Sequence, residues 1–84
     1  MYNFALDAEA RHVLLRCKTS DRQQLVKFFQ ALADDPYRRG DFNGTNADDR
    51  AVEVALCGRF LVTYWSDHAV KQVRVVYVDP VEVS

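Results

Sequence analysis

The sequence predicts an α+β domain in which an N-terminal strand and a two-helix hairpin pack with a mainly antiparallel sheet that ends in a three-strand meander. Two observations carry this prediction. Apolar residues recur at helical spacing between residues 8 and 34, and they alternate with period two between residues 50 and 78. At 84 residues the chain has the size of one domain with a single modest core. We therefore expect one domain over residues 1–84.

The N-terminal segment predicts a short strand followed by a helix. Tyr2, Phe4 and Leu6 alternate with smaller or polar residues, which is typical of a half-buried strand. Asp7 is a suitable N-cap for the helix that follows it. The expected apolar stripe of this helix consists of Leu6, Ala10, Val13, Leu14 and Cys17.

The second helix has the clearest local signature. Ser20 and Gln23 have the spacing of a capping box, which satisfies two free backbone N–H groups at a helix start. Asp35 precedes Pro36, where helical geometry is disfavoured, so the helix should end near residues 33–34. Its apolar stripe follows at positions i, i+3, i+4 and i+7: Leu25, Phe28, Phe29 and Leu32.

Residues 36–49 show neither period and are rich in Gly, Asn and Asp, so they are predicted to form a loop. A loop this long in a small domain is often functional. Arg38 and Arg39 could contact a phosphate, with Tyr37 and Phe42 available to stack on a base. The alternative is a solvated loop whose two aromatic side chains fold back on the core.

The C-terminal half predicts three strands, near residues 50–57, 59–65 and 70–78, joined by two-residue turns at Cys57-Gly58 and Asp67-His68. Period-two alternation then divides the sheet into two faces. The face expected to lie under the helices carries Ala51, Ala55, Phe60, Val62, Tyr64, Lys71, Val73, Val75 and Tyr77. The opposite face carries Arg50, Val52, Val54, Arg59, Leu61, Thr63, Trp65, Gln72, Arg74, Val76 and Val78.

The second face combines three arginines with a tryptophan and a threonine: Arg50, Arg59, Arg74, Trp65 and Thr63. Arginine and tryptophan serve nucleic-acid phosphates and bases, and both are also enriched at protein-binding hot spots. The alternative is that Arg50 and Arg74 solubilise the outer face. Its aliphatic residues would then meet the C-terminal tail or a second copy of the chain in a homodimer: Leu61, Val76 and Val78. A slip of one residue in strand register would exchange the two faces.

Charge and cysteine usage exclude several classes of protein. The net charge of −1 argues against nucleic-acid binding through charge alone, so a local arginine cluster or a larger machine such as the ribosome would have to contribute. Cys17 and Cys57 lie far apart in the chain, and neither His12 nor His68 has zinc-ligand spacing to them. We expect no metal and no cofactor. The N-terminus lacks signal-peptide character and no run is long enough to cross a membrane, so we expect a cytoplasmic protein without membrane contact.

The order of elements, the helix stop at Asp35-Pro36 and the pattern GRF-x-VTYW-x-DHAVK-x-VRV over residues 58–75 resemble the RelE/ParE superfamily of bacterial toxins from toxin–antitoxin modules. The resemblance covers nearly the whole chain. It implies a cognate antitoxin that wraps the toxin surface, and either metal-independent cleavage of mRNA on the ribosome or binding to a protein target such as DNA gyrase. A degenerate, toxin-like interaction domain is the third hypothesis.

Within that resemblance, Arg50 and Arg74 match family arginines by position and are the candidate catalytic cations. His68 is the candidate general acid–base, because it is the histidine placed to titrate near neutral pH, although an exposed turn histidine is the plainer interpretation. The candidate nucleic-acid or partner-binding residues are Arg59, Trp65, Thr63, Arg38 and Arg39.

Overall fold

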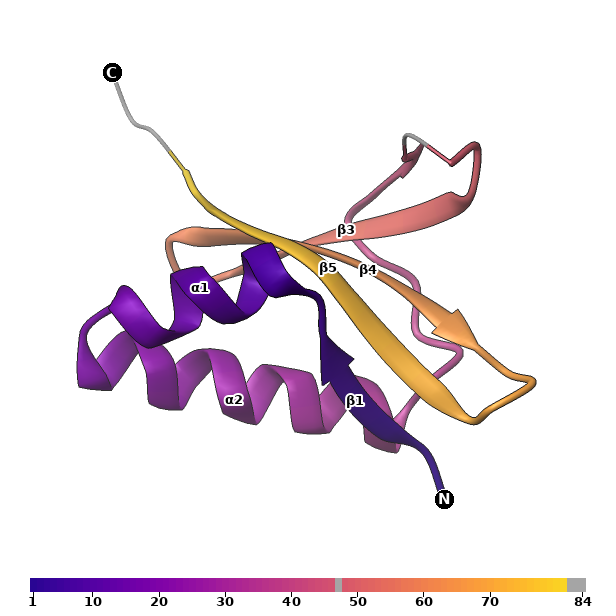
Figure 1. Ribbon diagram of the computed structural model, residues 1–84, viewed down its shortest axis with the longest axis horizontal. Helices are drawn as coiled ribbons and strands as arrows, with labels where there is room; N and C mark the ends of the chain where they lie inside the picture. The colour runs from indigo at the N-terminus through magenta and orange to yellow at the C-terminus, as the bar shows by residue number, and fades with distance from the viewer. Residues whose placement is uncertain (47, 82–84) are drawn as a thin grey trace.

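The computed structural model describes residues 1–46 and 48–81, which contain two helices and one five-stranded sheet. The elements in chain order are β1 (Asn3–Leu6), α1 (Ala8–Arg16), α2 (Thr19–Asp34), β2 (Phe42–Thr45), β3 (Ala51–Cys57), β4 (Phe60–Asp67) and β5 (Gln72–Pro80). The spatial order is β1-β5-β4-β3-β2, with β1 parallel to β5 and the other pairs antiparallel. Both helices lie on one side of this sheet (Figure 1), so the predicted α+β architecture is confirmed.

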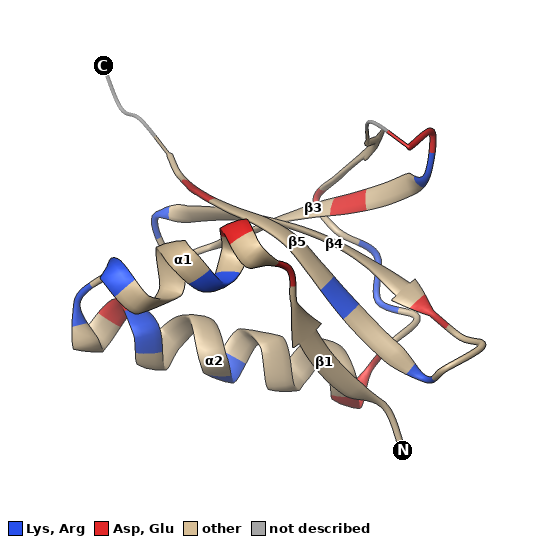
Figure 2. Ribbon diagram, viewed as in Figure 1, with Lys and Arg blue, Asp and Glu red and all other residues tan. Residues whose placement is uncertain are grey.

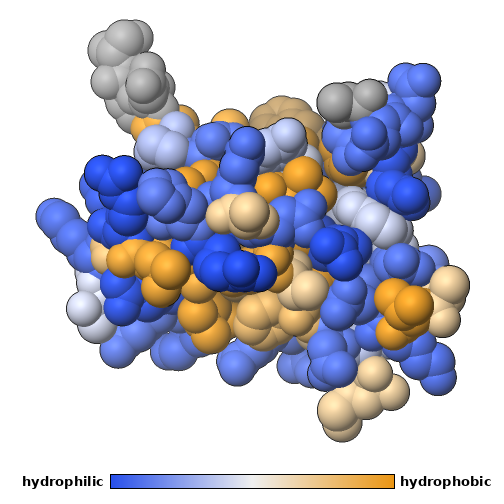
Figure 3. All heavy atoms as spheres, in the orientation of Figure 1, coloured by the Kyte–Doolittle hydropathy of each residue, from blue (hydrophilic) through white to orange (hydrophobic). Residues whose placement is uncertain are grey.

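The core lies between α2 and the covered face of the sheet. Leu25, Phe29 and Leu32 of α2 are at most 1% exposed, as their helical spacing predicts. Most of the core residues of the sheet were predicted for this face: Ala55, Phe60, Val62, Tyr64, Val73 and Val75. Outside the core, the helical side of the molecule shows apolar patches separated by hydrophilic side chains (Figure 3). None of the helices within the described ranges is long and apolar enough to cross a membrane.

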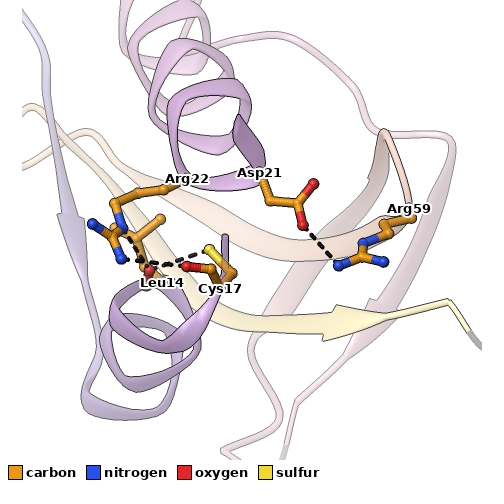
Figure 4. Close-up of polar contacts among 5 residues, drawn as sticks. All are labelled: Leu14, Cys17, Asp21, Arg22 and Arg59. Atoms are coloured by element: carbon orange, nitrogen blue, oxygen red, sulfur yellow. Dashed lines mark hydrogen bonds and ion pairs between the residues drawn. The ribbon is translucent and has the colours of Figure 1, made fainter. Parts of the chain in front are cut away.

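The start of α2 differs from the prediction. The N-cap is Lys18 and no side chain caps the helix, so the capping box predicted for Ser20 and Gln23 is wrong. Arg22 in the first turn of α2 instead satisfies the free carbonyl groups at the end of α1. Its guanidinium donates to the carbonyl oxygens of Leu14, Leu15 and Cys17 at 3.1, 3.2 and 3.3 Å. Figure 4 shows this side chain reaching back across the junction between the helices.

Strand β2 lies inside the segment that was predicted to be a loop. Its four residues are all exposed and include Asn43 and Gly44, which have low strand propensity. They form a strand because they pair with the free edge of β3, with Phe42 opposite Val54. Gly40, just before β2, passes so close to β3 that a Cβ would lie 2.6 Å from the carbonyl oxygen of Val54. The pairing is therefore a tertiary effect with no local sequence signal.

The two turns of the meander are displaced from their predicted positions. Cys57 pairs with Phe60, so the first turn is Gly58-Arg59 instead of Cys57-Gly58. Each residue of β3 therefore pairs two positions further along β4 than predicted, and an even shift leaves the faces of both strands unchanged. Gly58 has a φ of 57°, which glycine adopts without strain. Asp67 pairs with Gln72, so the second turn has four residues and places Lys71 in it, not on the covered face.

A β-bulge reverses the faces of the second half of β5. Tyr64 pairs with Val75, whereas its neighbour Thr63 pairs with Tyr77, so Val76 is an extra residue in this strand. As a result Val78 points into the core and is 1% exposed, while Tyr77 is 38% exposed. The prediction had assigned Tyr77 to the covered face and Val78 to the open face. Both assignments are wrong, because simple alternation does not anticipate a bulge.

Candidate functional site

A groove lies at the end of the sheet where β3 begins and β4 ends, and the segment that leaves α2 forms its wall. We call it the arginine groove and define it by its lining residues, Pro36–Arg39, Asp48–Ala51, Glu53 and Tyr64–His68. It contains five of the residues predicted for a site: Arg38, Arg39, Arg50, Trp65 and His68. The antiparallel pairing of β3 with β4 brings the start of one strand beside the end of the other.

The segment that carries Arg38 and Arg39 is held against the sheet by four hydrogen bonds. Two come from β4, where the Ser66 hydroxyl donates to the Pro36 carbonyl at 2.6 Å and the Tyr64 hydroxyl donates to the Arg38 carbonyl at 3.3 Å. Two more lie at β3, from the Gly40 N–H to Glu53 at 3.0 Å and from the Leu56 N–H to Asp41 at 2.8 Å. The backbone beneath both arginines is therefore positioned by polar groups of the sheet.

The Tyr64 hydroxyl stays protonated at neutral pH, as a hydrogen-bond donor must. Burial raises the pKa of Tyr64, and the nearby Glu53 carboxylate raises it further. Tyr64 itself is 2% exposed, so its ring belongs to the core while its hydroxyl reaches the groove wall. One side chain thus links the packing of the sheet to the position of Arg38.

Arg50 lies directly on Trp65, with its guanidinium carbon 3.8 Å from the ring centroid. This is a close cation–π contact, which orients the guanidinium plane. Arg74 of β5 is the register partner of Trp65 in the sheet, and its guanidinium is bound by Asp7 at 2.7 Å and Gln72 at 3.1 Å. Arg50, Trp65 and Arg74 line a second hollow that adjoins the arginine groove. The predicted grouping of these three residues is therefore present.

Asp7 does not act as the predicted side-chain cap. It occupies the N-cap position of α1, but its carboxylate makes no capping hydrogen bond. The same carboxylate binds Arg74 instead, 67 positions away in the chain. The Asp7 carboxylate therefore pairs with the Arg74 guanidinium on β5 and not with the backbone N–H groups in the first turn of α1.

His68 lies at the rim of the groove between two tyrosines. The Tyr2 hydroxyl is 2.6 Å from Nδ1 of His68, and the Tyr37 ring stacks on the imidazole at a centroid distance of 4.7 Å and an angle of 13°. Desolvation and the neighbouring Tyr37 phenol raise the pKa of Tyr2. The sequence predicted Tyr2 as part of a half-buried strand, from its alternation with Phe4. Its contact with His68 had no sequence signal, since the two residues lie 66 positions apart.

Two predicted residues lie elsewhere. Arg59 belongs to the turn before β4 and forms an ion pair of 2.7 Å with Asp21 of α2 (Figure 4), so it does not share a face with Arg50 and Trp65 as predicted. The displaced turn is the physical reason. Thr63 lies in the middle of β4, opposite Val54 on one side and Tyr77 on the other, and does not line the groove.

The groove carries both signs of charge. Its carboxylates are Asp48, Asp49, Glu53 and Asp67. Glu53 and Asp67 accept backbone N–H groups, from Gly40 and Ala69 respectively. Figure 2 shows the same mixture over the described residues, with basic and acidic segments interspersed along the ribbon. Within residues 1–46 and 48–81, no group of His, Cys, Asp or Glu side chains could hold a metal ion.

Comparison of the sequence with models of known protein families finds no match. Curated protein sequences give none either. Comparison of the structure does give matches, and these include RelE toxins and RelE–RelB complexes. The archaeal RelE–RelB complex from Pyrococcus horikoshii is similar with a TM-score of 0.77 and 15% identity, covering 99% of this chain and 98% of that chain.

Two further structures agree. The toxin–antitoxin complex RelBE2 from Mycobacterium tuberculosis matches with a TM-score of 0.74 and 20% identity over 94% of this chain and 96% of that chain. The isolated E. coli RelE toxin matches with a TM-score of 0.70 and 15% identity over 100% of this chain and 88% of that chain. The protein therefore has the RelE-like toxin fold, as its sequence resemblance implied.

Proposed function

We propose that this protein is the toxin of a toxin–antitoxin module and that it cleaves messenger RNA on the ribosome without a metal ion. The observation that carries the proposal is the arginine groove, in which Arg38, Arg39 and Arg50 meet Trp65 and His68 on a RelE-like fold. Arginine is the side chain best suited to bind phosphate oxygens in pairs. Tryptophan and histidine add flat surfaces and a titrating group.

The proposed reaction is attack of a ribose 2′-oxygen on the adjacent phosphorus. The 2′-oxygen loses its proton to a base, the new P–O bond forms, and the bond to the 5′-oxygen breaks as that oxygen takes up a proton. The products are a 2′,3′-cyclic phosphate and a free 5′-hydroxyl. Negative charge develops on the phosphate oxygens during this step, where fixed cations stabilise it.

Each catalytic candidate has a role that its contacts support. Arg50 is oriented by Trp65 and is assigned to the phosphate, with Arg74 beside it in the adjoining hollow. His68 is assigned to proton transfer: its Nδ1 is engaged by Tyr2, so Nε2 is the nitrogen that would exchange the proton with RNA. Arg38 and Arg39 would hold the flanking backbone, since their segment is tied to the sheet.

The charge balance favours RNA that is presented by a larger assembly. Four carboxylates share the groove with three arginines, and the whole chain has a net charge of −1. A protein that captured free RNA by charge would be distinctly basic. On the ribosome the mRNA is already positioned, so the toxin supplies local contacts only. The cytoplasm, where ribosomes act, is the expected location.

The proposed partner is a cognate antitoxin. The Pyrococcus horikoshii and Mycobacterium tuberculosis structures that share this fold are complexes of a toxin with its antitoxin. A reading frame for a small DNA-binding protein next to this gene would supply the candidate. Its co-expression should restore the growth that the toxin alone arrests.

The test of the function is expression of the chain alone, followed by growth curves and mapping of mRNA 5′ ends. We expect growth arrest with new mRNA ends that follow the reading frame. Arg50→Gln and His68→Gln should lower cleavage by about 10²–10³-fold, as for loss of one charge-stabilising or proton-transferring group. Lys27→Gln is the matched control, because it removes one positive charge from an exposed position on α2 outside the groove.

The outcomes separate the alternatives. Arrest with intact mRNA would reject the endonuclease and favour a toxin that binds a protein target. Normal growth with a soluble, folded chain would reject a toxin altogether and leave a toxin-like interaction domain. Equal loss of cleavage in Lys27→Gln and Arg50→Gln would show that net charge, rather than the groove, governs the reaction.

A further inference from the structure

Tyr37 and His68 form a stacked aromatic pair in which both residues are exposed. Tyr37 is 73% exposed, yet its ring lies nearly parallel to the imidazole, at 13° and a centroid distance of 4.7 Å. Neither residue belongs to the hydrophobic core. A large aromatic side chain held flat in solvent contributes little to folding, so its fixed orientation calls for another explanation.

Contacts from distant parts of the chain fix both rings. On one side, Tyr2 meets the imidazole edge-on at 73° and its hydroxyl lies 2.6 Å from Nδ1. On the other side, the Ser66 hydroxyl near the end of β4 donates to the carbonyl of Pro36, the residue before Tyr37. Ser66 lies two positions before His68, which belongs to the turn after β4. The turn below is closed by the Ala69 N–H on Asp67. The pair is therefore preorganised.

We propose that Tyr37 and His68 form a stacking platform for one base of the RNA that lies in the arginine groove. The imidazole covers one side of the Tyr37 ring, and at 73% exposure Tyr37 still offers ring surface to solvent. Arg38 and Arg39 follow Tyr37 directly and line the same groove, so a phosphate beside the stacked base meets a guanidinium. Aromatic rings bind bases of any sequence in this way, since every base has a π face.

This proposal rests on the proposed function for the presence of RNA, and it adds the site at which a base is recognised. It also explains how a groove of mixed charge holds RNA. Stacking does not depend on net charge, and it supplies affinity where the carboxylates of the groove weaken phosphate binding. A protein partner would be the competing occupant of an exposed tyrosine.

The test compares two small probes that differ only in the base. Adenosine 5′-monophosphate and ribose 5-phosphate are titrated into the full-length chain at low ionic strength, and binding is followed by NMR. We expect adenosine 5′-monophosphate to bind about fivefold or more tightly than ribose 5-phosphate, with upfield shifts of its base protons. In Tyr37→Ala the two affinities should become equal, while Tyr37→Phe and Tyr37→Trp should keep the preference.

Each other result overturns the platform. Equal affinity of the wild-type chain for both probes, or an unchanged preference in Tyr37→Ala, would leave Tyr37 to a protein partner. These results are distinct from failure of the proposed function. If the chain cleaves mRNA but shows no base preference, only the stacking platform is rejected. If Tyr37→Ala abolishes a base preference but the chain cleaves no mRNA in cells, the stacking platform is supported and the endonuclease is rejected.

Discussion

Arg74 of β5 and Asp7 at the start of α1 form an ion pair of 2.7 Å that joins the sheet to the first helix. Under the proposed function, an RNA phosphate would compete with Asp7 for the Arg74 guanidinium. Both side chains are about one-third exposed, at 37% and 36%, so solvent screens their attraction. The contact therefore orients Arg74 more than it stabilises the fold.

Arg74→Ala and Asp7→Asn should each lower the free energy of unfolding by no more than about 1 kcal/mol, as for a partly exposed pair. The double variant should have about the same free energy of unfolding as the less stable of the two single variants, because each substitution removes the same contact. Urea unfolding measures all three. A loss of several kcal/mol for Arg74→Ala would mean that the guanidinium is a buried charge and that the open face of the sheet has been misplaced.

Gly40→Ala should destabilise the protein and displace the wall of the arginine groove. The new Cβ would lie 2.6 Å from the carbonyl oxygen of Val54, which is backbone and cannot move aside freely. The expected loss is about 1–3 kcal/mol, typical of overpacking. Gly44→Ala is the matched control in the same segment, because nothing lies within 4 Å of its added Cβ. Equal stability of the two variants would show that β2 does not pair with β3 as described.

Stability should fall at alkaline pH in a way that depends on Tyr64. Burial raises the pKa of Tyr64 above its ordinary value of 10.0, so above that pH the unfolded chain releases the proton while the folded chain still keeps it. The stabilisation is complete below the unfolded pKa and is lost as the pH rises towards the folded one.

Tyr64→Phe should therefore be less stable than the wild-type chain by about 1 kcal/mol near pH 8, through loss of the hydrogen bond to Arg38, and the difference should shrink above pH 10. Unfolding curves in urea at several pH values measure it. Tyr77→Phe, on the exposed side of β5, serves as the control for loss of a hydroxyl. A constant difference across the pH range would contradict the raised pKa.

The two cysteines should differ in their rate of alkylation. Burial raises the pKa of Cys57, and its side chain is largely inaccessible, so little thiolate is present to react. Cys17 is partly exposed. Iodoacetamide at pH 8 should modify Cys17 first, as mass spectrometry of each peptide will show, and the difference should vanish in denaturant. If Cys57 reacted before Cys17 in the native protein, the Cys57 side chain would have to lie at the surface.

Local patterns were sufficient for both helices, for four of the five strands and for most of the core. The spacing of Leu25, Phe29 and Leu32 predicts the buried stripe of α2, and the alternation of Phe60, Val62 and Tyr64 predicts the covered face of β4. These predictions are correct because burial depends on the period of the chain itself: a helix repeats every 3.6 residues and a strand every two. The grouping of Arg50 with Trp65 follows from the same alternation.

The sequence by itself thus determined the fold class, most of the core and the membership of much of the groove. Tertiary structure alone decided the remaining features: the bulge at Val76, the pairing of β2, the partners of Arg59 and Arg74, and the tyrosines that hold His68. The physical reason is that local periodicity carries no information on such features. Each of these depends on a contact between segments distant in the chain or on one inserted residue, and neither leaves a periodic trace in the local sequence.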